Sequence, residues 1–391
     1  MPVPVQAKRV SRAEQVQYQR TLKLAVLRVW CCACSLLGSV QCTPAPRDGA
    51  AQLALTELRY LGSFGTVNYA ELAEDLGYLT PLRLKWMGNV LGGPESIQAV
   101  STRDIDFGSA ATGSVIKLIA AGAPIRQVMA SNGVDELSWG GYFVLAGSPV
   151  QNAHDLLGKT ISVNTLGAHA EFMIREYLRR GGLTKQQVKQ VTMVITPPIN
   201  GEQSLRLGHV DVASLSGVLR DRALQRGGLR LLFTDRDLFG NFNSSTTVFR
   251  TDFIEKRPNV VRAYVTATAR AIEWARATPK DAVRERLKQI LAKRKRGEDP
   301  ALAQHWHSVG IRSTGGVLSD ADMRLWIDWL DREGDLHSTK LHKLSDLYTN
   351  EFNPYREAPK SASYRALPQS ARADDSPLSS SANVRTSYAI E

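Results

Sequence analysis

The sequence predicts an α/β protein with two lobes, and three observations support that fold class. Short apolar runs typical of strands alternate with segments of helical periodicity from Leu53 onwards. The alternation falls into two blocks, and turns rich in Gly, Ser and Thr follow strands in both of them. Units this short favour parallel βαβ architecture, and ligands of such folds bind outside the carboxyl ends of the strands.

The first block is predicted to contain strands at residues 56–61, 82–87, 105–107 and 127–130. A helix that ends near Gly77 separates the first two strands. Residues 92–95 read Gly-Gly-Pro-Glu, the pattern of a helix that starts with proline and has an acid in its first turn. The small-residue loop 109–114 opens the next helix. Because helix N-termini favour negative charge, these two turns predict an anionic small-molecule ligand.

The second block repeats the pattern of strand, turn and helix. Its predicted strands are the run 142–146, the end of segment 155–164, and the runs 191–195, 210–213 and 229–233. A helix is expected at 171–180, and further turns are expected at 164–169, 197–202 and 214–217. We therefore expect two α/β lobes joined by extended crossovers.

The ends of the chain differ from this central region. The chain has 391 residues and a formal net charge of +11, much of it before residue 29. A positive segment followed by the uncharged apolar stretch 29–40 resembles a secretory signal, and that stretch is short for a membrane span. We expect residues 1–52 to be a leader and linker, and residues 355–391, rich in Ser, Ala, Pro and Arg, to be a disordered tail.

All four cysteines lie in the leader, at positions 31, 32, 34 and 42. Lipidation of Cys42 is one outcome, although Gln41 stands where a lipoprotein signal normally has a small residue. The region after Cys42 can form no disulfide and has no thiol nucleophile or thiolate metal ligand. We expect no metal and no cofactor.

Several segments together resemble a known family. They are Gly-Gly-Pro-Glu at 92–95, Arg-Asp-Ile-Asp-Phe-Gly at 103–108, Asp-Leu-Leu-Gly-Lys-Thr-Ile-Ser-Val at 155–163, and the segments 248–264 and 346–353. Their order is similar to that of the nitrate/sulfonate/taurine substrate-binding proteins of ABC transporters, within the NMT1/THI5-like superfamily.

The resemblance implies a type II periplasmic-binding fold with two hinge crossovers and a ligand cleft between its lobes. Lobe 1 would be discontinuous, with residues 53–145 and 247–354, and lobe 2 would contain residues 146–246. The implied function is that of the periplasmic solute-binding component of an ABC importer. Its partners would be a small anionic solute and a membrane permease, and the protein would act as a monomer without bond chemistry.

The cleft-facing turns of this fold give the candidate ligand shell. It contains Ser63, Phe64, Gly92, Gly93, Ala111, Thr112 and Gly113 from lobe 1 and Asn164, Thr165, His169 and Ser216 from lobe 2. Hydroxyl groups and free amides suit an oxyanion such as a sulfonate, nitrate or carboxylate. Each turn taken alone also fits ordinary loop chemistry, and His169 also fits a solvent-exposed helix start.

One departure from the family bears on the ligand. Members commonly place an aromatic residue and Asp after the strand that corresponds to 210–213, whereas this chain reads Ser-Leu-Ser-Gly at 214–217. Without that acid, taurine becomes a poorer ligand than an anion with a bulkier uncharged tail.

Other patterns have ordinary structural explanations. The basic run 284–296 fits a solvated helix end, and no nucleic-acid-binding motif accompanies it. His305 and His307 lack zinc spacing and are expected to be plain helix residues. Trp274, Trp326 and Trp329 recur at helical spacing and are expected in the core.

Two alternatives from other classes stay open. The same fold carries a thiamin-pyrimidine synthase and a desulfinase, so an enzyme is one alternative. The desulfinase chemistry needs a cysteine that this chain lacks after Cys42, and the Cys-rich motif of the synthase is absent. A degenerate homologue without a transported ligand is the other alternative.

Overall fold

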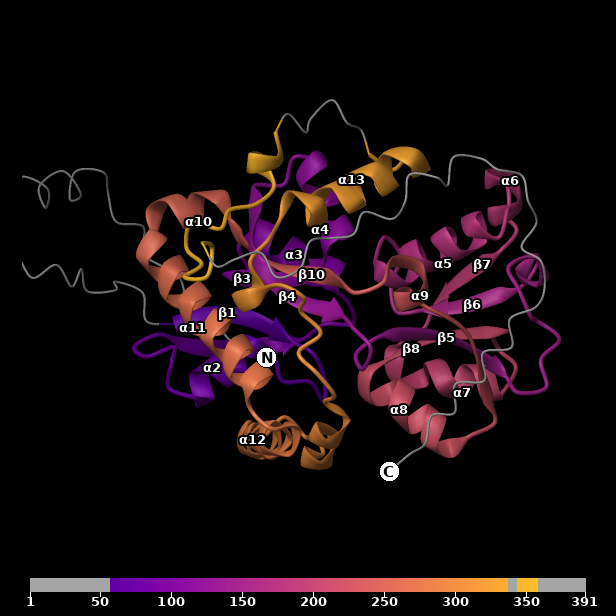
Figure 1. Ribbon diagram of the computed structural model, residues 1–391, viewed down its shortest axis with the longest axis horizontal. Coiled ribbons are helices and arrows are strands. Elements are labelled where there is room, and N and C mark those ends of the chain that lie inside the picture. The colour runs from indigo at the N-terminus through magenta and orange to yellow at the C-terminus, as the bar shows by residue number, and fades with distance from the viewer. Residues whose placement is uncertain (1–56, 337–342, 358–391) are drawn as a thin grey trace, which may run out of the picture. The chain divides into compact units, whose positions relative to one another are not determined.

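The computed structural model describes residues 57–336 and 343–357, which fall within one compact unit, Leu53–Glu391 (Figure 1). The expected leader, the four cysteines and most of the expected tail lie outside the described residues. The structure does describe residues 355–357, the first three residues of the expected tail. The Tyr355 ring packs over Gly315, where a Cβ on that glycine would lie 2.2 Å from Tyr355 Cδ2. The expected lobe boundaries stay a prediction.

The first group of strands forms two small sheets. Strands β1 (Glu57–Gly62) and β2 (Arg83–Asn89) pair in parallel, and a three-stranded sheet has the order β3-β10-β4. Its members are β3 (Phe107–Ala111), β10 (Phe242–Arg250) and β4 (Ile125–Val134). The helices beside these strands are α2 (Tyr69–Asp75), α3 (Gly93–Thr102), α4 (Thr112–Ala120), α10 (Thr251–Lys256), α11 (Pro258–Ala277), α12 (Lys280–Lys293) and α13 (Asp320–Glu333).

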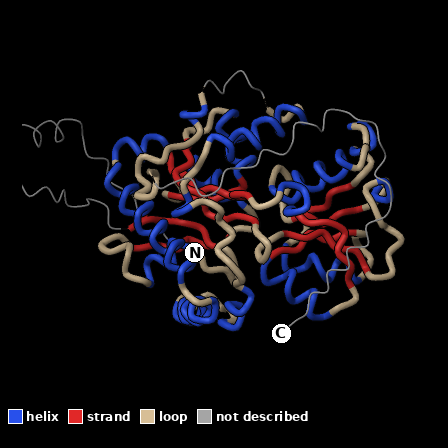
Figure 2. Tube along the Cα trace, viewed as in Figure 1, coloured by secondary structure: helices blue, strands red, loops and turns tan. Residues whose placement is uncertain are grey.

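The second group of strands is one five-stranded sheet of order β7-β6-β8-β5-β9. Its strands are β5 (Gly140–Leu145), β6 (Thr160–Val163), β7 (Thr192–Ile195), β8 (Val212–Ser216) and β9 (Leu229–Thr234). Helices α5 (His169–Arg180), α6 (Lys185–Val188), α7 (Gly201–Arg206), α8 (Gly217–Arg226) and α9 (Asp235–Phe239) accompany it. Figure 2 shows helices on both sides of the strands.

The sheets are mixed rather than wholly parallel. Strand β6 is parallel to β7 and β8, but β5 is antiparallel to β8 and β9, and β10 is antiparallel to β3 and β4. The chain leaves the first group after β4 and returns through β10, which the sequence pattern did not separate from the following helix. The expectation of parallel architecture therefore holds for the βαβ units and is wrong for the strands next to the two crossovers.

Local sequence explains where several helices begin. Asn68 caps α2 through a reciprocal pair of bonds with Glu71, and Thr234 caps α9 in the same way with Asp237. Pro94 stands in the first turn of α3, as the Gly-Gly-Pro-Glu pattern predicts. These caps fix the chain direction directly after β1, β2 and β9, and so fix the position of the turns at those strand ends.

The core contains two of the three tryptophans expected there. Trp326 and Trp329 on α13 are fully buried, whereas Trp274 on α11 is only partly buried against the same cluster. Full burial of an aromatic side chain contributes on the order of 1.5–3 kcal/mol. The predicted core position is therefore confirmed for Trp326 and Trp329, whereas Trp274 lies at the edge of the core.

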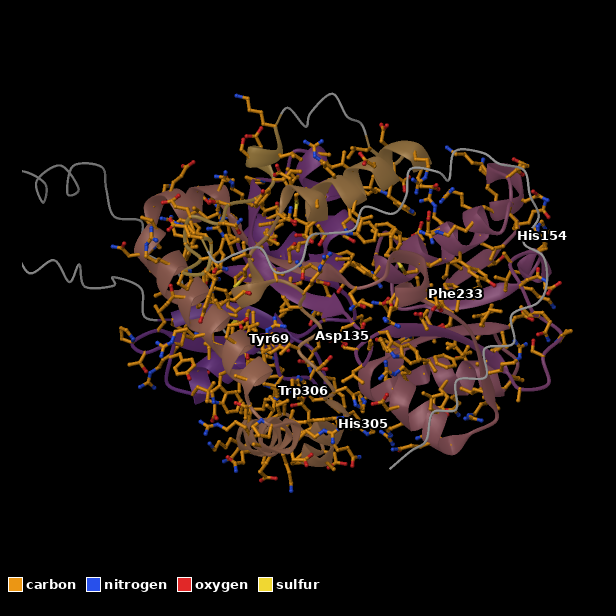
Figure 3. All side chains as sticks on the ribbon, in the orientation of Figure 1. Tyr69, Asp135, His154, Phe233, His305 and Trp306 are labelled. Atoms are coloured by element: carbon orange, nitrogen blue, oxygen red, sulfur yellow. The ribbon has the colours of Figure 1, made fainter. Side chains whose placement is uncertain are left out.

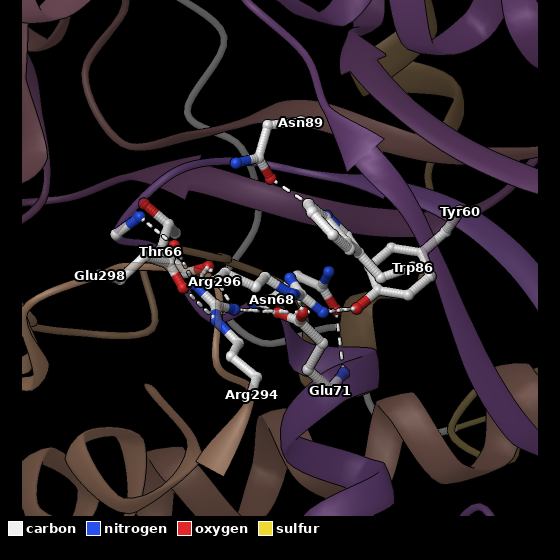
Figure 4. Close-up of polar contacts among 10 residues, drawn as sticks. Tyr60, Thr66, Asn68, Glu71, Trp86, Asn89, Arg294, Arg296 and Glu298 are labelled. Carbon is white, nitrogen blue, oxygen red and sulfur yellow. Dashed lines mark hydrogen bonds and ion pairs between the residues drawn. The ribbon is translucent and has the colours of Figure 1, made fainter. Parts of the chain in front are cut away.

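The end of the basic run 284–296 differs from the prediction. Arg294 and Arg296 follow α12, and each is only 8% exposed. Both guanidinium groups bind the buried carboxylate of Glu71 on α2, at 3.0 and 2.9 Å, and Glu298 accepts from Arg294 at 2.7 Å (Figure 4). A solvated helix end is wrong for these two residues, because buried carboxylates neutralise them.

Aromatic groups complete the surroundings of Arg296. Its guanidinium donates to the Tyr60 hydroxyl at 2.7 Å and lies 4.7 Å from the Trp86 ring centroid (Figure 4). Burial raises the pKa of Tyr60 far above its ordinary value, and the charge of Glu71 raises it further. The phenol therefore stays protonated, and the network ties residues 294–298 to β1 and α2.

Candidate functional site

Two predicted turns from different sheets meet directly. The Asn164 side chain, after β6, donates to the carbonyl of Leu91 at 3.2 Å. A Cβ placed on Gly92 would lie 2.7 Å from Thr165 Cγ2 and 2.9 Å from Asn164 Nδ2. Because Gly92 has extended backbone angles that any residue adopts, its lack of a side chain serves this close approach rather than the turn.

The turn after β1 lies open to solvent. Ser63 is exposed and forms an isolated bridge with Thr66, and the Phe64 ring is 51% exposed. On the other sheet Ser216 ends β8 and is exposed as well. These three predicted residues are therefore accessible to a ligand in this conformation.

The start of α4 is covered instead. Thr112 is fully buried, and its hydroxyl is directed to the carbonyl of Ser244 at 3.5 Å. A Cβ on Gly113 would lie 2.9 Å from Phe172 and 3.0 Å from Trp326. Ala111 precedes the helix and provides no side-chain cap. The first-turn amides of α4 thus begin beneath an aromatic cluster rather than at the open surface.

That aromatic cluster joins elements from both groups of strands. The Trp326 ring on α13 lies 5.7 Å from Phe172 on α5, 5.6 Å from Phe239 on α9 and 6.3 Å from Phe242 on β10. Within the described residues, Trp326 Nε1 is buried without a hydrogen-bond partner. A buried donor without a hydrogen bond lowers the stability of the fold by about 1–3 kcal/mol. The indole N–H of Trp326 is therefore a polar group without a partner inside this aromatic cluster.

His169, another predicted residue, is held by an acid that the sequence reasoning missed. Its Nε2 lies 3.0 Å from Asp235, whose carboxylate is 3% exposed and also accepts from the Gly140 amide at 3.0 Å. With the proton assigned to Nε2, His169 Nδ1 is a further buried nitrogen without a hydrogen-bond partner among the described residues. A Cβ on Gly140 would lie 4.0 Å from Ser216 Cβ, so these groups surround one end of β8.

An acid that follows β9 therefore lies near the end of β8. Asp235 is the first residue of α9, immediately after the Thr234 cap. The sequence Thr-Asp-Arg-Asp at 234–237 is a helix-capping pattern, and it directly follows the predicted strand 229–233. This pattern could have identified Asp235 as a candidate site residue at a strand end. Because Asp235 is bound to His169 and Gly140, it is not a free carboxylate.

A second set of contacts joins α5 to α13. Glu176, 2% exposed, accepts from Arg332 at 3.1 Å and from the Trp329 indole at 3.2 Å. Burial alone would raise the pKa of Glu176, but hydrogen bonds from Arg179 and Arg180 outweigh burial and lower it. The carboxylate therefore stays ionised and fixes α13 against the five-stranded sheet.

Large apolar side chains stand exposed at the strand ends around these turns. They are Phe64 after β1, Leu91 after β2, Leu166 after β6, and Ile195 and Ile199 at and after β7, all 48–64% exposed. Of these residues Leu166 also lines a cavity of 230 Å³, whose other walls are residues of α3 and α4 and Gly167. The surroundings combine polar donors with apolar surface, as small-molecule sites do.

Over residues 57–336 and 343–357, no group of His, Cys, Asp and Glu side chains could hold a metal ion. Within those ranges no helix has the length and apolar character needed to cross a membrane. His305 and His307 are not plain α-helix residues, since His305 ends a 3-10 helix and both bind Asp221.

The mixed sheets, the two crossovers and the meeting of strand-end turns define the fold of periplasmic binding proteins. The family model described as NMT1/THI5 like matches residues 90–282. The chain therefore carries an NMT1/THI5-like domain, as the sequence motifs indicated. No curated protein matches the sequence.

Solved structures confirm the fold. The periplasmic aliphatic sulphonate binding protein SsuA from Escherichia coli is 20% identical, with a TM-score of 0.55 over 72% of this chain and 87% of its own. The alkanesulfonate-binding protein SsuA from Xanthomonas axonopodis bound to MOPS is 20% identical, with a TM-score of 0.56 over 72% and 94%. The nitrate-binding protein NrtA from Synechocystis is 13% identical, with a TM-score of 0.58 over 78% and 88%.

An enzyme also has this fold. A cysteine-to-serine mutant of the desulfinase DszB in complex with biphenyl-2-sulfinic acid is 18% identical, with a TM-score of 0.54 over 76% of this chain and 97% of its own. At these identities the likeness establishes the fold alone.

Proposed function

We propose that this chain is the periplasmic solute-binding component of an ABC importer, and that it binds a small anionic organic solute between its sheets. The observation that carries the proposal is the contact of the Gly92 turn with Asn164 and Thr165. It brings a helix N-terminus and polar side chains from two sheets to one place, at the strand ends where α/β folds bind ligands.

The proposed ligand shell is the predicted set of eleven residues. Ser63, Ser216, Asn164 and Thr165 would donate hydrogen bonds, and the amides at Gly92 and Gly93 would face the anionic group. The residues at 111–113 would take part only after the sheets move apart, since they are buried here beside the aromatic cluster, whereas the His169 side chain is already 28% exposed. Four or five charge-assisted bonds of about 1.5–3 kcal/mol each suffice for micromolar affinity after ordering costs.

An uncharged tail on the ligand fits the surroundings best. Asp235 is already bound to His169 and Gly140, so it offers no free carboxylate to a ligand ammonium. The exposed Phe64, Leu91 and Ile195 offer apolar surface beside the polar turns. A sulfonate or carboxylate with an apolar tail is therefore favoured over taurine.

The remaining parts of the proposal concern location and partners. We infer export by the leader, with Cys42 as a site for a lipid anchor, and a monomer that presents its sheets to a membrane permease. Binding without bond chemistry is favoured over a desulfinase-like reaction, because no cysteine follows Cys42.

A ligand screen tests this function. Thermal unfolding of the purified protein would be followed with nitrate, bicarbonate, alkyl and aryl sulfonates, taurine, aromatic carboxylates and formylaminopyrimidine. A ligand at a hundred times its Kd stabilises the folded state by about 2.7 kcal/mol. A dose-dependent rise in Tm for one anion class supports the proposal, and no rise from a folded sample contradicts it.

A further inference from the structure

A cluster of ionisable side chains joins α8 to the segment after α12. Asp221 on α8 accepts from His305 Nδ1 at 3.2 Å and from His307 Nε2, both at the oxygen Oδ2. Arg220 binds the other oxygen, Oδ1, at 2.9 Å. His305 ends the 3-10 helix Pro300–His305, which packs on α12 (Figure 3). The Asp221 carboxylate therefore connects the five-stranded sheet to the 3-10 helix and, through it, to α12 and α2.

The cluster also holds one crossover between the sheets. Arg220 is 4% exposed, lies 4.1 Å from the Trp139 ring centroid and donates to the Trp139 carbonyl at 2.8 Å. The Ser308 hydroxyl donates to Asp135 at 2.8 Å. Because Asp135 and Trp139 lie in the crossover 135–139, a change in the angle between the sheets must strain or break the bonds of Asp221.

The two histidine rings differ in their contacts and exposure. His305 Nε2 lies 3.1 Å from Gln304 Nε2, a group that only donates, so the assigned ring is neutral with its proton on Nδ1. His307 contacts Asp221 through Nε2 and its side chain is 27% exposed. Solvent can therefore protonate His307 without loss of its bond to Asp221.

We propose that Asp221 and His307 form a proton-sensitive latch that holds α8 against the segment after α12 more firmly when His307 is protonated. Protonation changes a neutral N–H donor into a charged one, and charge-assisted bonds are about twice as strong. The latch needs no ligand, so it stands apart from the proposed solute binding.

The neighbouring charges agree with this direction. Arg220 would repel a positively charged His307. It binds Asp221 through Oδ1, however, whereas His307 binds through Oδ2, and Arg220 belongs to α8 itself. Burial alone would raise the pKa of Asp221, yet hydrogen bonding from His307 and the charge of Arg220 lower it. On the other side Arg284 of α12 donates to the Trp306 carbonyl at 2.9 Å, and Asp135 is bound to Ser308. Asp221 thus stays ionised across the range in which histidine titrates.

Hydrogen exchange of the full-length protein without ligand tests the latch. Exchange in α8 and in residues 300–309 would be measured at pH 6.0 and pH 8.0 and corrected for the intrinsic pH dependence of amide exchange. We expect opening in these segments to be about fivefold rarer at pH 6.0, the change that a gain of about 1 kcal/mol gives. The variant His307→Gln keeps a side-chain donor and should lose this pH difference.

Three variants complete the test. His305→Gln and the exposed control His154→Gln should keep the pH difference, and Asp221→Asn should lose it. Circular dichroism would establish that each variant folds. If His307→Gln does not fold, Asp221→Asn serves as the test variant in its place. Equal protection at both pH values in the unaltered protein, or a pH difference that persists in His307→Gln, would overturn the proposal.

Discussion

The contact between the Gly92 turn and the Asn164 turn gives the sharpest mutational prediction. The variant Gly92→Ala adds one carbon that would lie 2.7 Å from Thr165 Cγ2 and 2.9 Å from Asn164 Nδ2. Both distances are too short for real contacts, so one turn must shift. Gly92 has an extended φ of −167°, so alanine brings no backbone strain and the whole effect comes from this contact.

Overpacking of this kind costs about 1–3 kcal/mol. We expect Gly92→Ala to lower the free energy of unfolding by that amount in urea titrations, or to force the two turns apart and weaken anion binding. Gly147→Ala is the matched control, because a Cβ there has nothing within 4 Å and its φ is not positive. The control should change stability by less than 1 kcal/mol.

A double-mutant cycle identifies the partner. Thr165→Ser removes Cγ2 and keeps the hydroxyl, so Gly92→Ala combined with Thr165→Ser should recover part of the loss. If Gly92→Ala behaves like Gly147→Ala in both stability and binding, the two turns do not meet as described and the argument for a shared site fails.

Three further predictions concern the buried charges. Glu71→Ala leaves two buried guanidinium groups without their carboxylate and should lower the unfolding free energy by about 3–5 kcal/mol in urea, while the exposed Lys288→Ala changes it little; equal effects would refute the buried network. Because the pKa of Glu176 is lowered, its contribution to stability is present above its unfolded pKa of about 4.3 and is lost as pH falls through the lower folded value. Glu176→Gln should therefore flatten the unfolding free energy between pH 5 and pH 3, and an unchanged slope would contradict this. Asp235→Asn removes the charged acceptor of His169 and of the Gly140 amide, so it should lower the unfolding free energy by about 1–3 kcal/mol in urea, and an unchanged value would show that Asp235 does not hold these groups.

The sequence predicts the fold well where one short segment decides the structure. The Gly-Gly-Pro-Glu pattern identifies the start of α3, and the apolar runs locate β1, β2, β6 and β9 to within a few residues. The family motifs lead to the NMT1/THI5-like domain that residues 90–282 match. Helix caps, turn glycines and apolar periodicity are local patterns, so they can be recognised in one segment without knowledge of its distant contacts.

Contacts across long sequence separations could not be predicted in this way. Arg294 and Arg296 look like a solvated basic run until Glu71, more than two hundred residues earlier, is placed beside them. Asp235 follows β9, yet it contacts His169, which follows β6. Strand β10 pairs with β3 and β4, although the whole five-stranded sheet lies between β4 and β10 in the sequence. Charge and periodicity describe one segment at a time, whereas burial of a charge depends on its partner.

The most direct test of solute binding is calorimetric titration with a series of linear alkanesulfonates, using the unaltered protein and Asn164→Ala, with Asn152→Ala as control. The account predicts micromolar binding by the unaltered protein and the control. Asn164→Ala should lose about tenfold in affinity, the change that one hydrogen bond to a charged group gives. No binding heat for any alkanesulfonate from folded protein, or equal affinity in Asn164→Ala, would contradict an alkanesulfonate site at the meeting of the two turns.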